Sequence, residues 1–257
     1  MENRHMKAIW MIIGTLFLFS SPVCASILET KVAQANTFYT AAKYDSALVN
    51  YQQVVDAGYE SSALYFNLGN TYFKLKDIPS AILYFEKARK LDPTDEEILR
   101  NLEVANRMIV DKIDNLPQFF FKSWWDTFYN LFNADTWAWI SIVTFILTLI
   151  AAYFYLTSPY LWVRKTGFFF GLLLLFFTVG SFGLASQRYY YTKQISEAII
   201  FAPTITIKSS PGSSSVDLFV LHEGTKVVLV DEFNGWHKIK IGNGSVGWLP
   251  GDSFKGI

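Results

Sequence analysis

The fold of this chain is decided by two long uncharged runs, the first of which reads Trp137-Ala-Trp-Ile-Ser-Ile-Val-Thr-Phe-Ile-Leu-Thr-Leu-Ile-Ala-Ala-Tyr-Phe-Tyr-Leu156. The second run, residues 166–186, is equally free of Asp, Glu, Lys, Arg and His. A helix of about 20 apolar residues crosses the roughly 30 Å of hydrocarbon in a bilayer. Pro159 prevents one continuous helix, so we predict transmembrane helices at 137–156 and 166–186, joined by a loop at 157–165. Spans without ionisable groups lack the sites that mark pumps and channels, and we expect an anchor.

The predicted loop carries Arg164 and Lys165 and no acidic residue. By the positive-inside rule this loop lies in the cytoplasm. The sequence therefore predicts a multi-pass protein of the inner membrane, with its N- and C-terminal domains in the periplasm. Gly167 and Gly171 have the small-xxx-small spacing that lets two helices approach closely. We favour packing of the hairpin against itself, and a dimer contact is the alternative.

Composition and the first residues limit the chemistry of the chain. Lys plus Arg and Asp plus Glu number 22 each, and without a basic excess no nucleic-acid partner is expected. Residues 1–25 combine a basic start, an apolar run and small residues before Ser26, which predicts a signal peptide cleaved after Ala25. Cys24 is the only cysteine. Cleavage would therefore leave none for disulfides, thiol catalysis or metal binding.

Residues 26–115 are predicted to be helical and to contain a repeat. The stretch from Tyr65 to Pro93 matches the W-x2-L-G-x2-Y…A-x3-F…P pattern of a tetratricopeptide repeat, with Tyr65 in place of Trp. We predict repeats at about 28–61, the weaker one, and 62–95. A capping helix at 95–113 would start with a capping box formed by Thr94 and Glu97. The residues expected to pack the repeat are Leu68, Gly69, Tyr72, Ala81, Phe85, Ala88 and Pro93.

Repeats of this kind commonly hold a peptide or helix of a partner along their concave face. In family members that bind a C-terminal carboxylate, Asn and basic residues stand at fixed places, three of which Asn36, Asn70 and Arg100 occupy. Val32 and Val104 stand where two further charges would be, so we expect no complete carboxylate clamp. The prediction is a polar groove lined by Asn36, Asn70, Lys74 and Arg100. Solvated polar residues on helix faces are the alternative.

Residues 116–134 form an unusually aromatic segment before the first span. Its Phe, Trp and Leu residues recur at helical spacing, which predicts a helix lying in the plane of the membrane interface. A hydrophobic contact with a partner membrane protein is the alternative.

Residues 194–257 change to short β-rich runs separated by Gly-containing turns. The expected strands are 197–201, 204–208, 225–230, 236–241 and 245–249. Five strands in about 60 residues indicate a small barrel. The order of these segments, closing on Gly247 and Trp248, resembles a bacterial SH3 domain, in which Ser214 and Ser215 would lie in a loop of the binding side.

No catalytic, metal or cofactor site is predicted. Gly242-Asn-Gly-Ser-Val-Gly247 has the letters of a dinucleotide loop, but Trp248-Leu-Pro250 follows where a helix would have to start. An Asn-Gly hairpin turn is expected instead. His222 and His237 are the only histidines after residue 25, which supports neither a zinc site nor a His-assisted nucleophile.

The whole chain resembles the E-type Bat proteins of the Bacteroides aerotolerance operon. The resemblance is carried by the order of the segments and by Asn101-Leu-Glu-Val-Ala-Asn106, Ile109-Val-Asp-Lys-Ile113 and Leu221-His-Glu-Gly-Thr225. The resemblance implies that the protein is encoded beside a MoxR-type ATPase and beside membrane proteins with von Willebrand A domains. It also implies a membrane complex linked to aerotolerance or envelope stress.

The resulting fold class is a multidomain membrane protein with α-helical tetratricopeptide repeats, a transmembrane helical hairpin and a small all-β SH3-like barrel. We predict a non-enzymatic, membrane-anchored scaffold that binds partner proteins outside the cytoplasm through its repeats. By resemblance, the partners are membrane proteins with von Willebrand A domains. The alternative is a module that binds the cell wall, with peptidoglycan as ligand, or senses the envelope through the barrel.

Overall fold

A computed structural model describes residues 22–113, 119–194 and 196–257. The chain divides between Glu60 and Ser61 into two units. Most of the predicted signal peptide, residues 1–21, lies outside the described residues.

The first unit contains helices α2 (Pro22–Thr40) and α3 (Tyr44–Asp56). The turn between them is made at Ala42, which has a φ of 57°. Ala35 of α2 and Ala47 of α3 are fully buried, and Tyr51 and Val54 are buried beside them. Two small residues on facing helices let the backbones approach, while the larger side chains fill the remaining space.

The second unit begins with α4 (Ser62–Lys74), α5 (Ile78–Leu91) and α6 (Glu96–Asn106). Side chains cap all three: Ser61 accepts from Leu64 N, Asp77 from Ser80 N, and Asp95 from both Glu97 N and Ile98 N. The predicted capping box on Thr94 is therefore wrong. The carboxylate of Asp95, one residue later, reaches two free N–H groups of the first turn. The helix also ends at Asn106 rather than at residue 113.

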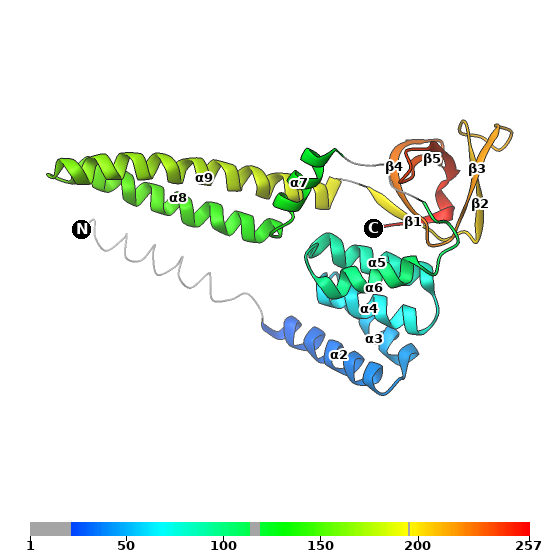
Figure 1. The fold of residues 1–257 in the computed structure, drawn as a ribbon. Coiled ribbons are helices and arrows are strands. Elements are labelled where there is room, and N and C mark those ends of the chain that lie inside the picture. Colours follow the sequence, from blue (N-terminus) through cyan, green and yellow to red (C-terminus); the bar gives the residue numbers. More distant parts are fainter. Residues whose placement is uncertain (1–21, 114–118, 195) are drawn as a thin grey trace, which may run out of the picture. The chain divides into compact units, whose positions relative to one another are not determined.

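The apolar hairpin consists of α8 (Ala134–Thr157) and α9 (Leu161–Gln194), which lie side by side (Figure 1). A short helix, α7 (Phe120–Tyr129), precedes them. By length and composition, α8 and residues 161–190 of α9 could each cross a membrane. The predicted loop at 157–165 is shorter in the structure, because α9 begins at Leu161 and includes Arg164 and Lys165.

The two hairpin helices touch through small and hydroxyl-bearing residues. A Cβ on Gly167 would lie 3.1 Å from Ala151 O, and one on Gly171 would lie 3.4 Å from Ala151 Cβ. Thr178 Oγ1 donates to Thr144 Oγ1 at 3.0 Å, which adds a polar contact between the helices. Both glycines therefore face α8, as the preferred interpretation of their spacing requires.

Seven antiparallel strands follow: β1 (Glu197–Ile200), β2 (Thr204–Lys208), β3 (Asp217–His222), β4 (Lys226–Phe233), β5 (Trp236–Lys240), β6 (Val246–Pro250) and β7 (Phe254–Gly256). Their order in the sheet is β3-β2-β6-β5-β4-β1-β7. The sequence predicted five of them and missed β3 and β7. Within residues 196–257 the edge strands β3 and β7 do not pair with each other, so the sheet is not the closed barrel that was expected.

The predicted hairpin turns lie between strands as expected. Asn234 and Gly235 connect β4 to β5, and both have positive φ (49° and 75°), as a type I′ turn requires. The stretch from Gly242 to Gly247 lies at the turn from β5 to β6, where Gly244 N donates to Ile241 O. It is not a dinucleotide loop.

The repeat and the sheet share one hydrophobic core, although the hairpin separates them in sequence. Ile199 of β1 is fully buried in the cluster formed by Ala81, Ile82, Leu83 and Phe85 of α5 and Leu102 and Ala105 of α6. Ile109, Phe201 and Ile257 pack around this cluster. Helix α5 is therefore covered by its own repeat on one side and by the sheet on another. The sequence predicted separate domains and did not indicate this contact.

Gly69→Ala should destabilise the repeat. A Cβ on Gly69 would lie 2.5 Å from Phe85 Cδ1, and the ring cannot move away because it is only 1% exposed. Overpacking of this kind costs about 1–3 kcal/mol. Urea unfolding of the detergent-solubilised chain measures the loss. Gly180→Ala is the matched control, because a Cβ there meets nothing within 4 Å; equal stability of the two variants would contradict the packing described.

Candidate functional site

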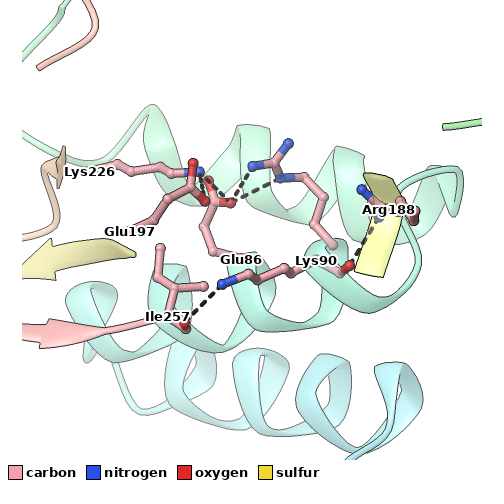
Figure 2. A network of polar contacts seen from close by, with 7 residues as sticks. Glu86, Lys90, Arg188, Glu197, Lys226 and Ile257 are labelled. Carbon is pink, nitrogen blue, oxygen red and sulfur yellow. Dashed lines mark hydrogen bonds and ion pairs between the residues drawn. The ribbon is translucent and has the colours of Figure 1, made fainter. Parts of the chain in front are cut away.

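A buried carboxylate on α5 joins the repeat to the sheet (Figure 2). Glu86 is 5% exposed and its Oε2 accepts from Arg89 Nη2 at 2.6 Å, within the same helix. Lys226 Nζ, at the start of β4, donates to the same oxygen at 3.1 Å and lies 2.9 Å from Glu197 Oε2 on β1. Burial alone would raise the pKa of Glu86, but the charges of Lys226 and Arg89 and their hydrogen bonds hold it below its ordinary value of 4.5.

The C-terminal end of α5 makes a second set of contacts, of which Figure 2 shows those of Arg188 with Lys90 and of Lys90 with Ile257. Arg188 of α9, although a cation, is only 2% exposed, and its Nη2 donates to Lys90 O at 3.0 Å. Its Nη1 donates to Asn130 Oδ1 at 3.1 Å, just after α7. Lys90 Nζ donates to Ile257 O at 3.3 Å. A cation at a helix C-terminus can donate hydrogen bonds to the free carbonyl groups there, and it interacts favourably with the negative end of the helix dipole. Helix α5 is thus attached both to the sheet and to the base of the hairpin.

Asp111 makes a third connection after α6 ends. Its Oδ2 accepts from His222 N and from Thr225 Oγ1, both at 2.7 Å, and its Oδ1 lies 2.8 Å from His222 Nδ1. Because an ionised carboxylate only accepts, Nδ1 carries the proton in this pair. Partial burial would raise the pKa of Asp111, but the hydrogen bonds from Thr225 and His222 lower it below 3.8. His222 therefore has a structural partner.

The predicted groove residues fall into two groups. Asn70 on α4 accepts from Asn101 Nδ2 on α6 at 2.8 Å, which links the first helix of the repeat to the following helix. Lys74 and Arg100, on these same two helices, are exposed. Asn36 belongs to the first unit, where its Oδ1 accepts from the hydroxyl of Tyr51. Burial, reinforced by Tyr39, raises the pKa of Tyr51 to about 12, so this hydroxyl keeps its proton.

The predicted packing residues lie inside the repeat. Tyr72 and Pro93 are half-buried, and the fully buried members are Leu68, Gly69, Ala81, Phe85 and Ala88. Helix α6 keeps Leu99, Arg100 and Val104 exposed. The open surface of this repeat therefore consists of the α6 face and the end of α4, since α5 is covered.

Sequence reasoning missed the residues that attach α5 to its surroundings: Glu86, Lys226, Glu197, Arg188 and Asp111. Arg188 carried a usable signal, because a charged residue that close to an apolar span needs a partner. Asp111 and Thr225 lie in two of the three short stretches that carry the resemblance given above, and the structure brings these two stretches together. Within residues 22–113, 119–194 and 196–257, no group of three or more His, Cys, Asp or Glu side chains could hold a metal ion.

The comparisons with known proteins concern the repeat. The tetratricopeptide repeat family model matches residues 62–95, the predicted second repeat. Human Tetratricopeptide repeat protein 6 is 36% identical over 64 residues, which cover 25% of this chain and 12% of that protein. The chain thus matches about an eighth of the relative's length. These repeats are a non-catalytic protein-interaction motif, and they indicate protein partners in general.

Glu86→Gln should weaken the attachment of the sheet to the repeat. The change keeps the shape of the side chain but removes the charge that Lys226 and Arg89 surround, and breaking a buried ion pair costs about 3 kcal/mol or more. Urea unfolding of the full chain in detergent measures the difference. Glu103→Gln is the control, since Glu103 pairs with Arg107 in an exposed i,i+4 bridge worth about 0.5 kcal/mol. Equal losses for both variants would show that Glu86 makes no buried contact.

The acid stability of the protein should depend on Asp111. A carboxyl group whose pKa is lowered by folding contributes stability above its unfolded pKa of about 3.9, and this contribution is lost as the pH falls through the lower folded pKa. The free energy of unfolding should therefore decrease less steeply below pH 4 for Asp111→Asn than for the unchanged protein. Parallel pH profiles would contradict the contact with His222 and Thr225. Asp252→Asn, at an exposed position, serves as the control.

Proposed function

We propose that this protein is a non-enzymatic scaffold, anchored in a membrane, that binds partner proteins through its tetratricopeptide repeats. The observation that carries the proposal is the matched repeat at 62–95, whose helix α5 is occupied by the sheet while α6 presents an open face. Arg100 supplies positive charge on α6 and Lys74 supplies it at the end of α4, while Leu99 and Val104 on α6 supply apolar contact area. A partner segment with an acidic group beside apolar side chains fits this surface.

Two observations support the membrane anchor and its topology. Most side chains in the middle of α8 and α9 are large, apolar and exposed, among them Phe145, Ile146, Leu172 and Phe176. Such a surface is stable in lipid and unfavourable in water. The parts before and after the hairpin also pack on each other, so they must lie on the same side of the bilayer, which two spans permit. With Arg164 and Lys165 in the cytoplasm, both parts would lie in the periplasm, anchored to the inner membrane.

We further propose that the chain is an E-type Bat protein, whose partners are the membrane proteins with von Willebrand A domains of the same operon type. The support is the order of segments together with the stretches around Asp111 and His222, which are in contact. The role in aerotolerance or envelope stress rests on this resemblance alone.

The second candidate is binding of the cell wall through an SH3-like C-terminal sheet. It is favoured by the open edge strand β3, where Leu218 and Val220 are exposed, as is Val216 just before the strand. Ser210 and Ser215 form a hydrogen bond in the preceding loop, so polar groups lie close to this apolar edge, as a ligand with both kinds of group would require.

Photo-crosslinking in cells tests the scaffold against the wall-binding module. A photoreactive residue at 74 or 100 in the full-length chain should capture one discrete membrane protein, while the same probe at 240, exposed on β5, should not. The crosslinked species are identified by mass spectrometry. If a probe at position 218 captures wall material while probes at 74 and 100 capture no protein, the scaffold proposal is wrong and the wall-binding proposal takes its place.

A further inference from the structure

Helix α7 lies within the aromatic segment for which the sequence predicts a place in the membrane interface, and its side chains are exposed. Phe120, Phe121 and Trp124 are each about 70% exposed, and Trp125 and Phe128 are more than 40% exposed. Water-soluble surfaces seldom carry so many large apolar side chains within ten residues. Lys122 is exposed among them. Contact with water is therefore unfavourable for the aromatic surface of α7, which is formed by Phe120, Phe121, Trp124, Trp125 and Phe128.

The C-terminal end of α7 is fixed to the first turn of α8. Trp137 Nε1 donates to Tyr129 O at 3.2 Å, and the Trp137 ring packs at 5.2 Å from Phe132 and 6.0 Å from Phe128 between centroids. Leu184 of α9 packs in the same cluster. Helix α7 consequently ends beside the first turn of α8, where the apolar part of the hairpin begins.

Arg188 fixes the same joint from the other helix. It binds Asn130 in the short connection between α7 and α8, and its guanidinium lies 5.8 Å from the centroid of the Tyr129 ring. Since Arg188 is charged and also binds Lys90 O of α5, this joint belongs at the boundary of the bilayer rather than in its hydrocarbon centre. The position of α7 is thus set at the level of the lipid headgroups.

We propose that α7 binds the membrane surface, with its aromatic side chains in the boundary between headgroups and acyl chains of the leaflet that α8 enters. This inference rests on the proposed membrane anchor. Tryptophan and phenylalanine side chains are stable at that depth, and Lys122 reaches the lipid phosphates. The membrane then holds the chain at three helices instead of two. Through Arg188, the depth of α7 also sets the position of α5, and with it the height of the open α6 face above the membrane.

Depth-dependent fluorescence quenching tests this proposal on the full chain in phosphatidylcholine–phosphatidylglycerol nanodiscs. In a Cys24→Ser background, which removes the only cysteine, single cysteines introduced by Phe121→Cys or Trp124→Cys carry an NBD label. Phe145→Cys, at an exposed position within α8, reports insertion of the hairpin, and Lys240→Cys on the sheet reports a position in water. Lipids with a nitroxide near the headgroup or deep in the acyl chain supply the quencher.

The proposal predicts that labels at 121 and 124 are quenched several-fold more by the shallow nitroxide than by the deep one, whereas the label at 145 shows the reverse order. The label at 240 should be unquenched. Lys122→Glu should decrease the quenching at 124 and leave that at 145 unchanged. Unquenched labels at 121 and 124 with a quenched label at 145 would overturn the membrane role of α7, in favour of water or a partner protein, while keeping the anchor. No quenching at 145 would overturn the anchor as well.

Discussion

The second unit depends on the buried carboxylate of Glu86. An ionised carboxylate in a site that is nearly closed to water is unstable unless cations compensate it. Arg89 supplies one cation from the same helix and Lys226 supplies the other from the sheet. Because Lys226 also pairs with Glu197, strands β1 and β4 are held to α5 by the same charge network. On the same helix, Ile199 of β1 packs in the apolar cluster of α5 and α6.

These contacts join the repeat, the apolar hairpin and the sheet into one unit. A tetratricopeptide repeat with two accessible sides could receive partners on either, but here the sheet covers α5 and leaves the α4–α6 side open. Arg188 connects the same helix to the base of the hairpin. Helix α5 is therefore held by both the sheet and the base of the apolar hairpin, and the exposed face of α6 belongs to the same unit as that hairpin. The shared core also means that residues 194–257 are a poor choice for study in isolation, since their removal would expose Ile199 and Phe201.

Sequence reasoning gave the local elements and missed the contacts between them. The hairpin, the repeat at 62–95 and five strands are each specified by patterns within a few tens of residues, such as uncharged runs, small residues at fixed spacing and alternating β-branched residues. Strand β3 was missed because Asp217 and the Ser-rich loop before it resemble a turn. Strand β7 was missed because three residues carry too little pattern. The α5 network joins Glu86 to residues more than a hundred positions later, and no local periodicity encodes such a pair. The proposed groove was only partly specified, since Asn70 is bonded to Asn101 while Lys74 and Arg100 remain exposed.

A double-mutant cycle between Glu86 and Lys226 tests the central claim most directly. The free energy of unfolding is measured for the full chain, for Glu86→Gln, for Lys226→Met and for the double variant. If the repeat and the sheet form one body around α5, the two changes will be coupled by about 1 kcal/mol or more, because residues in direct contact are not additive. Additive effects, with a coupling energy of about zero within the usual 0.3–0.5 kcal/mol, would show that the two side chains do not meet and that the repeat and the sheet are independent domains.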